Sequence, residues 1–330
     1  MFKINKKKFL PFFFTFLTSI SIFLNSGFNN CEAKNENLYT YLTKISNDGI
    51  EIINVSNKIE KVNLQEYLVG VIAGEIYLNY EEAAIKAQIL AAKNFVCFHL
   101  VNDLSNNKKI KPIPINNTFQ TYLNEKERQK KFGNKFKFNE DKLKNLVKSL
   151  DGIYIFVNNN ENKLANTVYF SSSNGEKTEN AKDVWGGDIS YLRSVDCSFE
   201  KPKIKILKFD YGNLLNLAKQ KNINANNDNV KNEDSVKIIS KSDSGRIQNI
   251  EIYGVNFSGE ETRKMLNLPS SYFNIEFQKD KIYFHCKGSG HGVGMSQNGA
   301  NILAKNQNKN FEEIIKHYYK GVEIKNINQI

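Results

Sequence analysis

The fold of this chain is decided by two nearby segments, LQEYLVGVIAGE at Leu64–Glu75 and EAAIKAQILAAK at Glu82–Lys93. Asn63 and Glu66 have the spacing of a capping box, which predicts that a helix begins there and continues to about residue 76. The second segment is rich in Ala, Ile, Leu and Lys, which favour a helix to about residue 100. Two helices therefore follow each other in the first third of the chain.

Strands are expected on both sides of these helices. Alternating apolar and polar residues predict short strands between Tyr39 and Val62. Further strands are predicted at 153–157, 164–171, 247–253 and 281–286, and further helices at 125–149 and 311–319. This mixture predicts an α+β fold, with strands and helices around one catalytic cleft and the chemistry on loops.

The composition is that of a folded protein with a mild basic bias. The 330 residues are 40% hydrophobic and 25% charged, and the formal net charge is +11. This length permits one large domain or two ordinary ones, and four cysteines cannot form a disulfide scaffold. Residues 1–34 account for +4 of the charge, which leaves +7 for the remainder. The excess indicates an anionic partner, but the lysines are scattered and do not form a nucleic-acid-binding stripe.

The N-terminus carries the pattern of an exported protein. Four lysines, at positions 3, 6, 7 and 8, precede an apolar run from Phe9 to Leu24, as in a secretory signal or an uncleaved signal anchor. No A-x-A cleavage site follows, and Cys31 lacks the small residues that a lipoprotein site has before it. We expect 1–34 to be a signal peptide or a membrane anchor, and 35–330 to form one domain outside the cytoplasm. The Asn-rich stretch 221–235 is expected to be a flexible surface excursion.

Three acidic and basic side chains stand out near the two helices. Glu75 ends an apolar stretch, where it could serve as a general acid beside a cleft or be a surface glutamate at a helix end. Lys86 and Lys93 are seven residues apart, so they project from one helix face, either towards a substrate or into solvent.

Two glycine-rich loops could bind a ligand. Ser171–Gly175, followed by Lys177, could cradle an anion or form a tight turn, and its spacing matches neither a Walker loop nor a nucleophile elbow. His291 lies in a glycine-rich run that ends at Gln297, where the backbone can approach a ligand or a strand closely. A metal site with residues 285 and 286 is disfavoured, because strand alternation places that His and that Cys on opposite faces.

Taken together, these segments resemble the stage II sporulation protein D family, which are peptidoglycan lytic transglycosylases of endospore-forming bacteria. The resemblance extends from about residue 60 to residue 325. It rests on several segments in the family's order, at 64–75, 82–93, 170–180, 184–186, 244–246, 270–273 and 290–297.

The resemblance implies an exported, membrane-anchored enzyme on the outer face of the cell membrane at the engulfing septum. Its substrate would be denuded glycan, cut between N-acetylmuramic acid and N-acetylglucosamine to leave anhydro ends. The implied partners are stage II sporulation protein P, an amidase, and stage II sporulation protein M, a membrane scaffold. The catalytic acid would be Glu75, and the substrate-binding residues would be Lys86, Lys93, Lys177, Ser171, Gly175, His291 and Gln297.

Some relatives bind zinc through one histidine and two cysteines after the second helix. Here the stretch 101–122 contains neither residue type, so we expect no metal and no other cofactor. The competing interpretation is a non-catalytic module that binds cell-wall glycan within the sporulation machinery.

Overall fold

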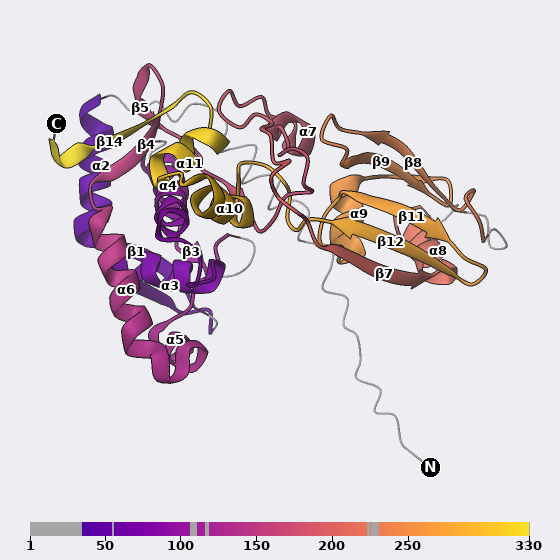
Figure 1. The fold of residues 1–330 in the computed structure, drawn as a ribbon, viewed down its shortest axis with the longest axis horizontal. Helices are drawn as coiled ribbons and strands as arrows, with labels where there is room; N and C mark the ends of the chain where they lie inside the picture. The colour runs from indigo at the N-terminus through magenta and orange to yellow at the C-terminus, as the bar shows by residue number, and fades with distance from the viewer. Residues whose placement is uncertain are drawn as a thin grey trace, which may run out of the picture.

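The computed structural model describes residues 35–329, except 55, 106–110, 116–118, 223–224 and 226–230. Helices and strands are mixed along these residues, which confirms the α+β fold class. The predicted signal or anchor, 1–34, lies outside the described residues, as does part of the stretch 221–235. Figure 1 shows two groups of elements side by side, which we call the helical lobe (35–200 and 289–329) and the sheet lobe (204–288).

The helical lobe contains most of the helices and three small sheets. Its elements are α2 (Asn35–Asp48), β1 (Ile50–Ile53), β2 (Ile59–Val62), α3 (Leu64–Glu75), α4 (Glu82–Ser105), β3 (Ile113–Pro114), α5 (Glu125–Phe132), α6 (Phe136–Ser149), β4 (Ile153–Val157), β5 (Asn160–Leu164), β6 (Tyr169–Phe170), α7 (Ala181–Trp185), β13 (Met295–Ser296), α10 (Gln297–Gln307), α11 (Phe311–Tyr318) and β14 (Val322–Asn326). The sheets have the strand orders β2-β1-β3, β14-β4-β5 and β13-β6.

The sheet lobe is an insertion between α7 and β13. Its elements are β7 (Ile204–Asp210), α8 (Tyr211–Lys221), β8 (Val236–Lys241), β9 (Ile247–Ile252), β10 (Val255–Ser258), α9 (Gly259–Met265), β11 (Phe273–Phe277) and β12 (Lys281–Lys287). They form two antiparallel sheets of order β10-β9-β8 and β11-β12-β7.

Apolar side chains are buried in two clusters, one in each lobe. The larger cluster surrounds α4, which packs against α2, α3, α10 and α11. Among the described residues this helix is the one long and apolar enough to cross a membrane, over Glu82–Asp103, but 83% of that window is buried inside the protein, as in a core helix. The two clusters give each lobe its own core, and a single domain over 35–330 stays a prediction.

The strand prediction is wrong for residues 39–48, which belong to α2. Leu38, Leu42 and Ile45 are all buried, and their spacing of four and three residues places them on one helical face against the core. The strands begin only at Ile50, after Gly49 turns the chain with a φ of +78°.

The helix predicted at 64–76 is confirmed as α3, although its cap differs. Asn63 accepts a hydrogen bond from the backbone N–H of Gln65 at 2.8 Å. Glu66 instead forms an ion pair with Arg128 of α5, whose guanidinium also contacts Glu140 of α6 at 2.8 Å. This buried arginine therefore joins three helices of the helical lobe.

Candidate functional site

Glu75 is the last residue of α3 and is half-buried. Its Oε1 accepts a hydrogen bond from the backbone N–H of Thr121 at 2.6 Å. The chain at Thr121 lies directly on the helix, because a Cβ on Gly74 would be only 2.4 Å from the Thr121 carbonyl oxygen. One turn earlier, the N–H of Leu123 donates to the Gly70 carbonyl at 3.1 Å. Two glycines thus admit the segment that orients the Glu75 carboxylate.

Two buried phenols lie near this carboxylate. Tyr67 donates to Oε1 of Gln120 at 2.9 Å, and Nε2 of Gln120 donates to the hydroxyl of Tyr169 at 3.0 Å. Burial, and then the negative charge of Glu75, raise the pKa of both Tyr67 and Tyr169. Both phenols therefore stay protonated at neutral pH.

Lys131 of α5 is a neighbouring cation. Its Nζ donates to the carbonyl of Ala73 at 2.6 Å. Burial lowers the pKa of Lys131, and the nearby carboxylate of Glu75 opposes that shift. Sequence reasoning missed this lysine, Gln120 and Tyr169, because they approach Glu75 only in the folded chain.

His291 contacts the main chain of β6. Its Nε2 contacts the carbonyl of Tyr169 at 3.1 Å, and its Nδ1 accepts from the N–H of Val293 at 3.1 Å. Burial lowers the pKa of His291 to about 4, so the ring is neutral, with its proton on Nε2. Its ring centroid is 5.1 Å from that of Trp185. The imidazole is therefore neutral and held in place from both ring nitrogens.

β6 pairs in parallel with β13, which brings Ser171 and Gln297 together. The N–H of Asn298 donates to the Ser171 carbonyl at 3.0 Å. Ser171 is exposed, whereas Gln297 is buried and its Nε2 has no hydrogen-bond partner in the part of the chain that the structure describes. This pairing places the two glycine-rich loops predicted from the sequence next to each other.

Glu200 joins these loops and was not predicted. The carboxylate is 1% exposed and accepts hydrogen bonds from the N–H of Ser173 (3.0 Å), Nδ2 of Asn298 (2.9 Å) and Oγ of Ser296 (2.8 Å). It thereby holds the loop 171–175 against the start of α10. Nothing in the local sequence marks it.

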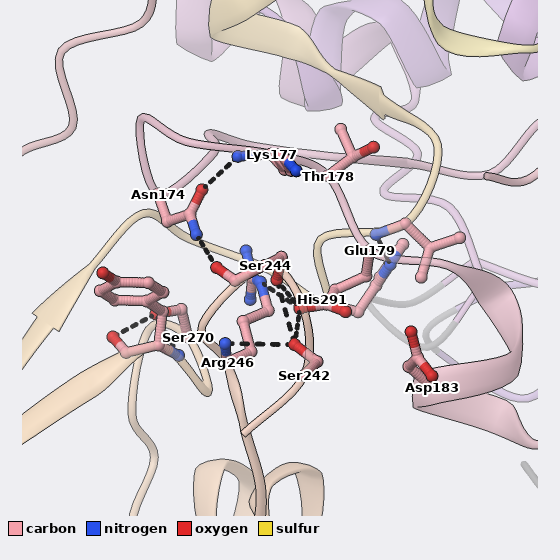
Figure 2. A network of polar contacts seen from close by, with 12 residues as sticks. Asn174, Lys177, Thr178, Glu179, Asp183, Ser242, Ser244, Arg246, Ser270 and His291 are labelled. Atoms are coloured by element: carbon pink, nitrogen blue, oxygen red, sulfur yellow. Dashed lines mark hydrogen bonds and ion pairs between the residues drawn. The ribbon is translucent and has the colours of Figure 1, made fainter. Parts of the chain in front are cut away.

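Gly175 ends the same loop, and Lys177 follows it; Figure 2 shows Lys177 beside Asn174. Gly175 has a φ of +80°, and a Cβ there would be 2.5 Å from the ring of Pro202, so the turn requires glycine. The N–H of Lys177 donates to Oδ1 of Asn174 at 3.2 Å, and its side chain is exposed. Lys177 is therefore accessible to an anionic ligand.

The structure does not bring Lys86 and Lys93 to one open surface. Lys93 is 4% exposed, its Nζ donates to the carbonyl of Leu150 at 2.6 Å, and it lies 4.3 Å from the centroid of the Tyr154 ring. Burial lowers the pKa of Lys93 to about 8. Lys86 is half-buried and pairs with Glu82 at 2.7 Å. In this arrangement the Lys93 side chain packs in the core rather than on the surface.

The alternation expected at residues 285 and 286 is confirmed. Cys286 is buried, whereas His285 is turned outward and contacts Glu276 at 2.9 Å. Within the described ranges, no three His, Cys, Asp or Glu side chains are grouped as a metal site would require. The absence of zinc stays a prediction.

Polar side chains of the two lobes meet at Glu179 and Arg246 (Figure 2). Oε1 of Glu179 accepts from Ser242 at 2.7 Å and from Ser244, and lies 3.6 Å from Nε of Arg246. Nη1 of Arg246 donates to the Gly290 carbonyl at 3.0 Å. Burial raises the pKa of Glu179, and the two serines and the arginine oppose that shift.

Two cavities are found in the described part of the chain, one in contact with this cluster and one apart from it. One of about 60 Å³ lies beside Arg246, and one of about 400 Å³ lies between α3 and α6. Glu75 lines neither of them. The residue itself is partly exposed at the end of α3.

Comparison with known proteins covers both lobes. A family model described as stage II sporulation protein matches residues 54–156, which include Glu75. A second model, described as a domain of unknown function, matches residues 207–294 and so covers most of the sheet lobe.

Three relatives match most of the chain. Stage II sporulation protein D of Bacillus amyloliquefaciens is 32% identical over 279 residues, which are 84% of this chain and 78% of that protein. The protein of the same name from Bacillus subtilis is 32% identical over 285 residues, which are 85% and 80% of the two chains. An uncharacterized protein of Brachyspira hyodysenteriae is 30% identical over 290 residues, 86% of this chain and 71% of its own. Matches of this length necessarily include residues of both lobes.

Proposed function

Because this chain belongs to the stage II sporulation protein D family of sporulation proteins, we propose that it is a peptidoglycan lytic transglycosylase in which Glu75 is both acid and base. The observation that carries the proposal is the geometry of Glu75. Its carboxylate is oriented by the N–H of Thr121 at 2.6 Å, yet the side chain remains partly open to a ligand. A fixed and accessible carboxyl is what proton transfer to a bound sugar requires.

One carboxyl group can complete the reaction. In the first half, the Glu75 carboxylic acid gives its proton to the glycosidic oxygen as the bond to C1 of N-acetylmuramic acid breaks. In the second half, the carboxylate takes the proton of the C6 hydroxyl, whose oxygen attacks C1 and closes the anhydro ring. The enzyme ends protonated, as it began, and no water is consumed.

The groups around Glu75 suit this role. The phenols of Tyr67 and Tyr169 keep their protons, and Tyr67 donates its own to Gln120, so neither adds a second negative charge near the carboxylate. The neutral ring of His291, which contacts the Tyr169 carbonyl and lies beside Trp185, does not compete for the transferred proton.

The substrate we propose is denuded glycan, which carries a lactyl carboxylate on each muramic acid. Lys177 is exposed beside the loop Ser171–Gly175, and Lys86 is half-buried at the start of α4. These lysines and the residual net charge of +7 would attract such a polyanion. Gln297, with its unpartnered amide nitrogen, is a further candidate for hydrogen bonding to the sugar.

The setting is part of the proposal. Residues 1–34 would direct export of the enzyme, either as a membrane anchor or as a signal peptide that is cleaved. The enzyme would work at the outer face of the membrane during engulfment. Its partners would be the amidase stage II sporulation protein P, which strips the stem peptides, and the scaffold stage II sporulation protein M. The alternative is a wall-binding module without catalysis.

The substitution Glu75→Gln tests the mechanism, because it keeps the shape and removes the titratable proton. Anhydro-ended products from denuded glycan, identified by mass, should fall by about 10²–10⁴-fold. Binding of the same strands should persist. Glu125→Gln, an exposed residue in the first turn of α5, is the control and should cleave normally.

The outcomes separate the two functions. Undiminished cleavage by folded Glu75→Gln would remove Glu75 from the mechanism and direct attention to Glu176, Glu179 and Asp183. A parent protein that binds denuded strands and releases no anhydro ends would establish the wall-binding module instead.

A further inference from the structure

β7 is an uncovered edge of the sheet β11-β12-β7. It pairs with β12 over seven residues, from Ile204 opposite Lys287 to Asp210 opposite Lys281, without a register shift. Its other side has no strand partner among the described residues. Figure 1 shows this strand along the lower border of the sheet lobe, away from β8 and β9. The strand therefore presents a straight row of unpaired main-chain groups.

The side chains of β7 are unusual for a free edge. Ile204 is 60% exposed and Ile206 is 55% exposed. Lys203, Lys205 and Lys208 are exposed around them. Lysines of this kind protect a free edge from aggregation, but the exposed isoleucines beside them do not.

The other sheet edges of this lobe lack this combination. β8 has a comparably exposed residue, Ile239 at 56%, but its register shifts between Ile238 and Ser240 and again at Lys241. Such bulges discourage a further strand. β10 has four residues and β11 five, and no large apolar side chain on them is exposed. β7 is thus the long, regular and partly apolar edge.

We propose that β7 is the docking edge for an extended acidic segment of a partner protein, which adds a fourth strand to the sheet. On the outer face, Ile206 neighbours His285 and Lys208 neighbours Tyr283 across the ladder. A partner strand with apolar residues on this face would cover the isoleucines, and its acidic residues would pair with the lysines of 203–208. Main-chain hydrogen bonds give such complexes their affinity, and the side chains give specificity.

The charge of β7 selects this occupant over a second copy of the chain. Pairing of two β7 strands would gather the lysines of both copies, at 203, 205 and 208, on one short ladder, and like charges that neighbour each other across a ladder are destabilising. A glycan strand would satisfy the lysines, but it offers no apolar side chains for Ile204 and Ile206 and no peptide groups for the edge.

The probe is a seven-residue peptide in which Glu alternates with Val and Ile, added to the full-length chain. Hydrogen exchange followed by mass spectrometry reports on each strand. At a peptide concentration about ten times its Kd, the exchange that the peptide blocks should slow about tenfold. We expect this at 204–210 and not at 236–241. A peptide with Lys in place of Glu should have no effect.

Two matched variants locate the contact. Ile206→Lys should abolish the protection, whereas Ile239→Lys, at a similarly exposed isoleucine on the bulged edge, should retain it. An unchanged thermal transition shows that both variants are folded. Glu75→Gln should keep the protection, so the docking edge and the proposed catalysis succeed or fail separately.

Three results would overturn the proposal. One is that the acidic peptide leaves exchange at 204–210 unchanged. Another is a concentration-dependent dimer in sedimentation that Ile206→Lys abolishes, which would make β7 a contact between copies. The third is protection of β7 by denuded glycan in preference to the peptide, which would make the strand part of the glycan path.

Discussion

At the scale of single residues, burial decides what a charged side chain can do. Lys86 and Lys93 lie on one helix with the spacing of a common face, but α4 is a core helix and its surroundings differ along its length. The ammonium of Lys93 is enclosed by Leu150 and Tyr154, while that of Lys86 reaches Glu82 near the surface. Helical spacing alone cannot distinguish the two, because it reports a direction and not the depth of the packing around it.

The stability of the protein should therefore depend on pH through Lys93. In the unfolded chain its amine keeps a proton up to about 10.5, but in the folded protein its pKa is lowered to about 8. Between these values the unfolded chain binds more protons, so the free energy of unfolding rises with pH. Relative to Lys93→Met, the parent should gain about 2 kcal/mol between pH 8 and pH 10. Chemical denaturation across this range measures the difference.

Lys86→Met, at a half-buried lysine of the same helix, is the matched control for the substitution itself. Lys93→Met should also bind denuded glycan as the parent does, whereas Lys86→Met should bind it more weakly. A folded Lys93→Met variant that loses glycan binding without a change in stability would contradict the buried position of this lysine.

At the scale of elements, close packing at α3 connects the fold to the site. Gly70 and Gly74 are four residues apart and therefore share one helix face, where the chain at Thr121 and Leu123 lies against them. The helix and its carboxylate could be predicted from the sequence, because periodicity and capping are local signals. The segment that orients Glu75 could not, since nothing local indicates which residues pack against the two glycines.

Gly74→Ala tests this packing. The added Cβ would lie 2.4 Å from the Thr121 carbonyl oxygen, so the segment must move and the hydrogen bond to Glu75 must lengthen. We expect a loss of about 1–3 kcal/mol in the free energy of unfolding and a clear loss of glycan cleavage. Gly212→Ala in α8 is the matched control, because nothing lies within 4 Å of a Cβ there. Equal behaviour of the two variants would refute the close approach.

The difference between local sequence signals and distant packing partners also explains α2. Its residues alternate in polarity for a few positions, which predicted a strand, but Leu38, Leu42 and Ile45 face the core together only in a helix. A short stretch of sequence can fit both the period of a strand and the period of a helix, and the element that it packs against decides between them. Glu200 is a similar case in the site. Its buried carboxylate accepts hydrogen bonds from three groups on two segments far away in the sequence, and such a residue has no periodic signature.

At the scale of the whole molecule, the two lobes have separate cores and are joined by polar contacts. Glu179 comes from the loop before α7, and Arg246 from the turn before β9. Both side chains are at most 2% exposed, and Ser242 and Ser244 complete the cluster. The segments that carry these residues could be recognised from the sequence, but the pairing across the two lobes could not, because it depends on how the lobes dock.

Glu179 and Arg246 should therefore be energetically coupled. Removing one member leaves the other as an uncompensated buried charge, so Glu179→Gln and Arg246→Met should each cost about 3 kcal/mol. The double variant should cost less than the two single losses combined, by at least about 1 kcal/mol. Denaturation of the four proteins in a double-mutant cycle measures this coupling, and the exposed pair Asp188 and Arg193 should show none that is measurable.

Because each lobe buries its own core, the single variants should also separate the calorimetric transition into two. Additive losses with one undivided transition would mean that the lobes are held together by other contacts.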